Sequence, residues 1–210
     1  MENEIILVNK PKGITSAKVV DIIKKKFNVK AGHTGTLDPL ATGLLIILTG
    51  DKTKQFSSFL NFPKVYEVEG ILGIKTDTFD LEGKVLAKNK DKISKKQLKE
   101  VLKNFKGEIE QIPPVFSAKK IKGKQAYKLS REGKEVKLSP QKVKIYSLSI
   151  LSFKYPYFKL VLKVSSGFYV RSFINDIGEK LKVGATVKEI KRIAIGPYKL
   201  EQAKNLKELI

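Results

Sequence analysis

Residues 31–50 read AGHTGTLDPLATGLLIILTG, a glycine-rich loop followed by a long apolar run. The run from Gly43 to Gly50 predicts a buried strand. The loop before it holds the chain's only histidine, His33, and one carboxylate, Asp38. It contains no lysine, although the chain is rich in lysine.

Three further stretches have the apolar spacing of helices. The pattern predicts a helix that begins with Ser16 as its N-cap, a helix over 51–62 that buries its phenylalanines, and a helix over 94–105. The last is the clearest, because Ser94 and Gln97 have the spacing of a capping box.

Strands are predicted on both sides of these helices, over 5–8, 64–73, 143–153 and 157–166. Residues 165–181 turn from strand to helix, and the tail reads as a short helix, a strand over 193–199 and a final helix. Strands and helices mix without strict alternation, so we expect an α+β fold around a mixed sheet rather than a doubly wound fold.

Composition excludes several classes of protein. The chain has 42 Lys+Arg against 21 Asp+Glu, a net charge of +21, which favours polyanionic partners and chiefly nucleic acid. Lysine enrichment from genome composition or heat adaptation is the alternative explanation of this charge. No cysteine is present, so disulfides, thiolate catalysis and Cys-ligated metals are excluded. No apolar run approaches the roughly 20 residues of a membrane span, and the first residues do not resemble a signal peptide. We therefore expect a cytoplasmic protein.

One segment concentrates the positive charge. Residues 115–142 hold nine Lys/Arg against two Glu, about +7 in 28 residues, with Phe116 and Tyr127 interleaved. This composition is typical of a nucleic-acid contact.

Asp38 and His33 are the first candidates for chemistry. Pro39 biases Asp38 to an extended backbone, and a carboxylate presented in this way can act as a nucleophile or as a general base. A structural Asp that accepts hydrogen bonds in a turn is the alternative. The loop lacks the phosphate-loop pattern, and the chain has no G-x-S-x-G elbow for a serine hydrolase.

A second constellation lies in SSGFYVRSFINDIG, where Tyr169 and Arg171 are two residues apart. In a strand they would share one face, where the arginine could orient a carboxylate and the tyrosine could stack on a base. Tyr66, in VYEVEG, is a second tyrosine that could stack on a base. A core tyrosine and a surface arginine are the structural alternative.

Taken together, these segments resemble the TruB family, the tRNA pseudouridine-55 synthases. The resemblance runs from about Leu7 to Tyr198 and rests on motifs in the family order: NKPKGITS, GHTGTLDPLATGLL, VYEVEGILGIKTDTFDLEG, IPPVFSAKKIKGKQAY and SGFYVRSFINDIGEKL. IKRI at 190–193 lies where the family has Leu-Arg-Arg, with Lys191 replacing one arginine.

The resemblance implies a fold and a reaction. The fold would be the pseudouridine synthase fold, with a largely antiparallel central sheet flanked by helices and an RNA-binding thumb insertion at about 112–142. The reaction would isomerise uridine 55 in the T loop of tRNA to pseudouridine, after the base is flipped out of its stack. It is redox-neutral, so no cofactor and no metal are expected.

The resemblance also assigns residues. Asp38 would be the nucleophile, with Arg171 as its counter-ion. Tyr66 would stack on the uracil near C5, and Tyr169 and Ile190 would complete the pocket. His33 would pack where the flipped base was, and Lys119, Lys120 and Lys124 of the thumb would grip phosphates.

Many bacterial members continue into a small C-terminal RNA-binding, PUA-like domain, whereas this sequence ends at residue 210. We therefore expect a single catalytic domain over 1–210. We also expect a monomer that binds the T arm of tRNA without an obligatory protein partner or a membrane. A non-catalytic RNA binder, a guide-RNA-dependent synthase and a synthase acting on ribosomal RNA are the rival interpretations.

Overall fold

The computed structural model describes residues 2–117, 120–121, 124–125 and 138–209. These residues form two compact units. Unit 1 comprises Met1–Glu67, Leu162–Ser166 and Glu189–Ile210, and unit 2 comprises Val68–Val161 and Gly167–Lys188. The chain passes from one unit to the other four times: within the strands β4 (Lys64–Leu72), β11 (Tyr157–Val164) and β12 (Ala185–Ile195), and between Ser166 and Gly167.

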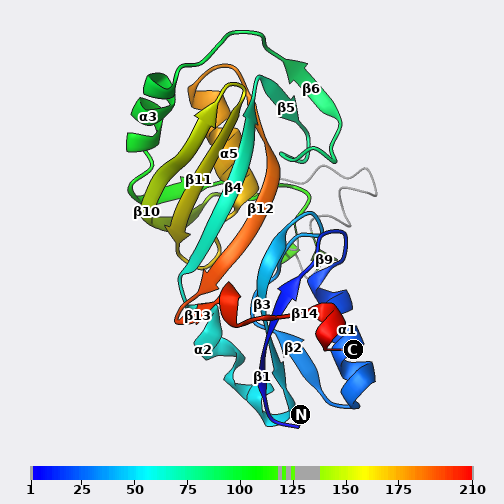
Figure 1. Cartoon of the computed structure of the whole chain (residues 1–210). Helices are drawn as coiled ribbons and strands as arrows, with labels where there is room; N and C mark the ends of the chain where they lie inside the picture. The colour runs from blue at the N-terminus through cyan, green and yellow to red at the C-terminus, as the bar shows by residue number, and fades with distance from the viewer. Residues whose placement is uncertain (1, 118–119, 122–123, 126–137, 210) are drawn as a thin grey trace. The chain divides into compact units, whose positions relative to one another are not determined.

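Unit 1 is built around β3 (Thr42–Thr49), the strand that the apolar run predicted. Its strands follow the order β14-β1-β3-β12, with β2 also paired to β3 and β13 to β12 (Figure 1). The β1–β3, β2–β3 and β12–β13 pairs are antiparallel, and the β1–β14 and β3–β12 pairs are parallel. The remaining elements are β1 (Ile5–Lys10), α1 (Ser16–Phe27), β2 (Ala31–His33), α2 (Phe56–Leu60), β13 (Tyr198–Lys199) and β14 (Lys204–Asn205), with 3-10 turns at Gly50–Gln55, Leu200–Gln202 and Leu206–Glu208.

Apolar side chains from β3 form the core of unit 1. Leu44, Ile46 and Leu48 pack with Phe59 of α2 and Ile195 of β12. Aromatic rings close one side of this cluster, where the ring centroids of Phe59 and Tyr198 lie 5.8 Å apart. The core therefore fixes the strand into which the loop of His33 and Asp38 leads.

Unit 2 orders its strands β4-β11-β10-β7, and Figure 1 shows β4, β11 and β10 side by side. The β7–β10, β5–β6 and β8–β9 pairs are antiparallel. Phe105 and Phe168 pack against Phe173 of α5, with ring centroids 5.1 and 5.6 Å from it. The elements are β5 (Ile74–Thr76), β6 (Val85–Lys88), α3 (Lys95–Lys103), β7 (Gly107–Gln111), β8 (Lys120–Ile121), β9 (Lys124–Gln125), β10 (Gln141–Lys154) and α5 (Val170–Lys180).

The mixed, mostly antiparallel strand pairing with helices confirms the α+β prediction. The capping box of Ser94 and Gln97 at the start of α3 is also confirmed, since each side chain bonds the backbone of the other residue.

Three local predictions were wrong. Thr15, not Ser16, is the N-cap of α1, and its side chain accepts a hydrogen bond from the Lys18 amide. The helix expected over 51–62 is a 3-10 turn followed by the five-residue α2, and Phe56 is exposed. The tail, expected as a short helix, a strand over 193–199 and a final helix, is instead the strand β12, the two-residue β13 and a 3-10 turn at Leu206–Glu208. Short segments of this kind are governed by tertiary packing more than by local spacing.

Candidate active site

Asp38 lies half-buried in the loop of residues 34–41 between β2 and β3, called here the Asp38 loop. Backbone hydrogen bonds fix this loop. The Thr34 amide donates to the Ile46 carbonyl at 3.0 Å, and the Ala41 amide donates to the Asp38 carbonyl at 3.0 Å. The Gly13 amide donates to the Pro39 carbonyl at 2.8 Å. The carboxylate is therefore carried on a backbone that is held on its C-terminal side by the turn after β1.

Lys10 reinforces the same contact from inside the protein. Its side chain is fully buried, and Nζ donates to the carbonyls of Pro11, Ile14 and Pro39 at 2.8, 2.9 and 3.4 Å. Burial lowers the pKa of Lys10 to about 8, against the opposing attraction of Asp38. Residues 9–13 thus form a turn, and a hydrogen bond from Lys10 to the Pro39 carbonyl links this turn to the Asp38 loop.

His33 ends β2, opposite Ile47 of β3. Its Nδ1 is buried and has no hydrogen-bond partner among the residues that the structure describes. Burial, reinforced by the charge of Arg192, lowers the pKa of His33 below 6.5. The imidazole is therefore neutral near pH 7, which suits a side chain that packs against bases better than one that attracts phosphates.

Tyr66 and Ile190 are both buried in unit 1, on β4 and β12. The carbonyl of Ile190 accepts a hydrogen bond from Thr42 Oγ1 at 3.4 Å, at the start of β3. Ile190 is thus attached through its backbone to the strand that follows the Asp38 loop.

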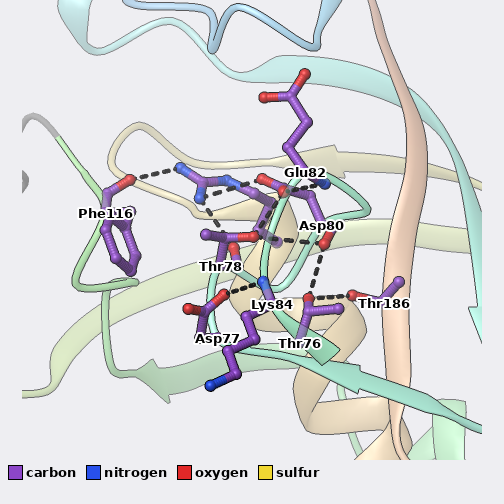
Figure 2. A network of polar contacts seen from close by, with 9 residues as sticks. Thr76, Asp77, Thr78, Asp80, Glu82, Lys84, Phe116 and Thr186 are labelled. Atoms are coloured by element: carbon purple, nitrogen blue, oxygen red, sulfur yellow. Dashed lines mark hydrogen bonds and ion pairs between the residues drawn. The ribbon is translucent and has the colours of Figure 1, made fainter. Parts of the chain in front are cut away.

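Arg171 is buried in unit 2, and groups of that unit bond its guanidinium. Nη1 donates to the Thr78 carbonyl at 3.0 Å and lies 3.5 Å from Asp80 Oδ2, while Nη2 donates to the Phe116 carbonyl at 2.9 Å (Figure 2). Phe116 lies at the start of the basic segment 115–142. The guanidinium therefore connects α5 with the start of that segment and with the loop that carries Asp80.

The loop from Thr76 to Gly83 is itself fixed by side chains (Figure 2). Thr78 Oγ1 donates to Asp80 Oδ1 at 2.6 Å, and the Glu82 amide donates to the same oxygen at 3.0 Å. Thr76 Oγ1 donates to the Asp80 carbonyl at 2.7 Å and shares a hydrogen bond with Thr186 Oγ1 at 2.8 Å. Thr76, Thr78 and Asp80 thus build the support of Arg171.

Tyr169 and Arg171 do not occupy a strand, so the prediction that they share a strand face was wrong. Tyr169 is the extended N-cap residue of α5, and Arg171 lies within the first turn. The backbone of Tyr169 is bonded in both directions by Gln111, whose Nε2 donates to the Tyr169 carbonyl at 3.2 Å and whose Oε1 accepts from its amide at 3.0 Å.

The basic residues of the predicted thumb are described only in part. Lys119 lies outside the described residues. The backbones of Lys120 and Lys124 belong to the paired strands β8 and β9, with Lys120 opposite Gln125 and Ile121 opposite Lys124.

Sequence reasoning missed three supports of the Asp38 loop: Lys10, Ser16, whose hydroxyl bonds the backbone of Leu37, and Arg192, whose guanidinium bonds the carbonyls of Gly35 and Thr36. A signal was present for two of them. Ile6, Val8 and Lys10 alternate on the buried face of β1, and Ile190 and Arg192 alternate on the buried face of β12. A cation at an inward position of an apolar strand needs internal hydrogen-bond acceptors, and here it finds backbone carbonyls.

The described part of the chain offers neither a metal-binding cluster nor a helix that could cross a membrane. No group of three or more His, Cys, Asp or Glu side chains there could hold a metal ion. No helix there has both the length and the apolar character that crossing a membrane requires.

A family model and proteins of known name both match this chain, and they point to the same family. A family model described as TruB family pseudouridylate synthase (N terminal domain) matches residues 21–170. The chain is 48% identical over 208 residues to tRNA pseudouridine synthase B of Aquifex aeolicus (strain VF5), covering 98% of this chain and 72% of the relative. It is 44% identical over 209 residues to the protein of the same name from Clostridium tetani (strain Massachusetts / E88), covering 99% of this chain and 72% of the relative.

Among solved structures, a chain in the crystal structure of a Cbf5-Nop10-Gar1 complex superposes with a TM-score of 0.76 at 30% identity. The match covers 97% of this chain and 52% of that chain, so this sequence spans about half of its length. The family match and the relatives confirm the resemblance drawn from the motifs. The chain belongs to the TruB family of pseudouridylate synthases, which are isomerases.

Proposed function

We propose that this protein isomerises uridine 55 in the T loop of tRNA to pseudouridine, with Asp38 as the nucleophile. The observation that carries the proposal is the Asp38 loop. It presents a half-buried carboxylate on a backbone that hydrogen bonds from Gly13 and Lys10 fix at the next residue, Pro39. A reacting group held in this way avoids part of the entropic cost of alignment. The relatives named tRNA pseudouridine synthase B support tRNA as the substrate.

The reaction balances without a cofactor. The C1′–N1 bond breaks, the freed base rotates, and C5 bonds to C1′. C5 then loses its proton and N1 gains one, so no electron is lost or gained. Asp38 would attack C1′ or C6, or take a proton from C2′. Each route needs an ionised carboxylate next to a base that has left its stack.

The other site residues have supporting roles in the proposal. Tyr66 stacks on the uracil and assists proton removal from C5. Tyr169 and Ile190 complete the pocket. His33 packs into the RNA where the base was, which its lowered pKa favours because a neutral ring loses less hydration when it stacks.

Arg171 is the proposed counter-ion of Asp38. The fixed position of the guanidinium supports this role, because the Thr78 and Phe116 carbonyls and the Asp80 carboxylate hold it within unit 2. A fixed guanidinium can hold a carboxylate with little further loss of side-chain entropy.

The net charge of +21 and the basic segment 115–142 support tRNA binding through phosphates. We further propose that the protein acts as a monomer in the cytoplasm without a partner protein. The likeness to a chain of the Cbf5-Nop10-Gar1 complex favours one alternative, a synthase that works only within an assembly.

Position-specific tritium release tests the proposal. The purified protein alone is mixed with a T-arm hairpin tritiated at C5 of its uridines, and with a hairpin in which the uridine at the position of U55 is replaced by cytidine. We expect release from the first hairpin and none from the second. Release only after other proteins are added would support the assembly alternative, and release only from ribosomal RNA fragments would refute the T-loop assignment.

A further inference from the structure

The guanidinium of Arg192 bonds the Asp38 loop and the strand that follows it. The side chain is only 1% exposed, on β12 within unit 1. Nη2 donates to the Gly35 carbonyl at 3.0 Å and Nη1 to the Thr36 carbonyl at 3.3 Å. Nε donates to the Leu44 carbonyl at 2.8 Å. Two acceptors precede Asp38 and one follows it, so a single planar group ties together the two ends of the segment that carries the carboxylate.

The backbone of Arg192 is fixed at the same place. β12 pairs in parallel with β3, with Arg192 opposite Gly43. Gly43 has φ +102°, and a Cβ at this position would lie 2.3 Å from the Arg192 carbonyl oxygen. The two strands therefore approach more closely than a side chain at position 43 would allow, and the backbone of Arg192 lies directly beside that of Gly43.

Ser16 bonds the same loop at Leu37, the residue directly before Asp38. Its side chain is 1% exposed at the first residue of α1. Oγ donates to the Leu37 carbonyl at 2.9 Å and accepts from the Leu37 amide at 2.8 Å. Leu37 directly precedes Asp38, so one hydroxyl satisfies both backbone groups of the neighbouring residue. Thr15 performs the N-cap role, which leaves the Ser16 hydroxyl to the loop.

These contacts are costly if their purpose is stability alone. Among the residues that the structure describes, the hydrogen-bond acceptors of Arg192 are backbone carbonyls and include no carboxylate. Burying a guanidinium removes it from water at a cost in free energy, and an apolar side chain of similar volume would avoid that cost. The charge also lowers the pKa of nearby Lys10, Lys64 and His33, after burial itself. What an apolar side chain could not provide is a rigid fork of donors that fixes several carbonyls at once.

We propose that Arg192 and Ser16 are positioning residues that set the geometry of the Asp38 carboxylate through the backbone of its loop. The inference rests on the proposed role of Asp38 and adds to it the residues that orient it. Neither residue is assigned a contact with RNA. Their loss should therefore slow the chemical step and leave RNA affinity nearly unchanged.

Ser16→Ala and Thr15→Ala form a matched pair that tests the inference. Both substitutions remove a hydroxyl at the start of α1, but only Ser16 contacts the Asp38 loop. At a temperature well below both melting points, Ser16→Ala should lower the single-turnover rate at saturating T-arm RNA by roughly 10- to 100-fold, the scale of a misaligned reacting group. Its Kd for the RNA should stay within about threefold of the wild type, and Thr15→Ala should keep the wild-type rate within about twofold.

Arg192→Lys separates position from charge. Lysine keeps the positive charge but has no planar fork, so it cannot bond the carbonyls of Gly35, Thr36 and Leu44 together. We expect a rate loss comparable to that of Ser16→Ala with RNA affinity retained. A wild-type rate in Arg192→Lys would overturn the inference for the arginine, because charge alone would then suffice.

The outcomes for the two proposals differ. If the wild type releases tritium in an Asp38-dependent manner, but Ser16→Ala and Thr15→Ala lose rate only in proportion to their loss of melting temperature, the positioning role is wrong and the proposed function stands. If the wild type itself does not turn over the T-arm RNA, or Asp38→Asn retains the rate, the proposed function fails first.

Discussion

At the scale of single residues, unit 1 buries three cations, Lys10, Lys64 and Arg192, around backbone carbonyls. Lys10 and Arg192 support the Asp38 loop, whereas the hydrogen bond of Lys64 goes to the Leu60 carbonyl in α2. The positive charge of the chain is therefore not only a surface property, because part of it holds the backbone near the proposed nucleophile.

Because of the two buried lysines, we expect the free energy of unfolding to change with pH in the alkaline range. Burial lowers the pKa of Lys10 and Lys64 from 10.5 to about 8. Between these values the unfolded chain binds more protons than the folded protein, so the free energy of unfolding rises with pH, by up to about 1.4 kcal/mol per pH unit for each lysine. Urea denaturation at pH 8, 9 and 10 should give a smaller rise for Lys64→Met than for the wild type. Equal rises would contradict the lowered pKa of Lys64.

Tyr66 carries the second prediction at this scale. Tyr66→Phe keeps the ring but removes the hydroxyl, so it should keep RNA affinity and slow single turnover, by roughly 100-fold if the hydroxyl takes part in proton transfer. Quench measurements at saturating RNA give the rate. An unchanged rate would dismiss the proton role and leave Tyr66 with stacking alone.

At the scale of elements, the glycines around the Asp38 loop are not equivalent. A Cβ on Gly43 would meet the Arg192 backbone at 2.3 Å, and its φ is +102°, whereas a Cβ on Gly32 would meet nothing within 4 Å. Gly43 is therefore required by the β3–β12 approach, and Gly32 is not required for space.

Gly43→Ala and Gly32→Ala test this difference. We expect Gly43→Ala to lower the free energy of unfolding by about 2–4 kcal/mol, since both the clash and the positive φ penalise a side chain. Gly32→Ala should change it by less than about 0.5 kcal/mol. Both are measured by urea denaturation at pH 7. Equal losses would mean that β12 can move away from β3 at little cost.

The elements also show how far the sequence could predict the fold. The buried strand after Asp38 and the capping box of α3 follow from local patterns, and the structure has both. The role of Ser16 did not follow, because its partner Leu37 is 21 residues away. Tyr169 and Arg171 were expected on a strand, but Gln111, 58 residues away, holds the backbone where α5 begins. Supports that depend on distant partners leave little trace in a local pattern.

At the scale of the whole molecule, the net charge of +21 does not by itself locate the RNA. The segment 115–142 is the proposed contact, but the exposed face of α3 is also rich in lysine, with Lys95, Lys96 and Lys99. A local role for the thumb and a diffuse attraction by the whole surface predict different salt dependences.

Two charge-matched triple variants distinguish these cases. Reversal of Lys119, Lys120 and Lys124 to Glu should weaken T-arm binding and reduce the slope of log K against log salt by roughly 0.9 for each lost duplex phosphate contact. Reversal of Lys95, Lys96 and Lys99 changes the net charge equally and should leave the slope nearly unchanged. Equal effects in a filter-binding titration would show that the attraction is diffuse.

The proposed role of Asp38 as nucleophile is tested by comparison with asparagine at the same position. Tritium release from a T-arm hairpin labelled at C5 of its uridines is followed for the wild type and Asp38→Asn, with the Kd of each measured in the same buffer. Asn has nearly the shape of Asp but is not a comparable nucleophile or base. We expect release by the wild type alone, with Kd values that agree within a few-fold. Release by Asp38→Asn at the wild-type rate would contradict it.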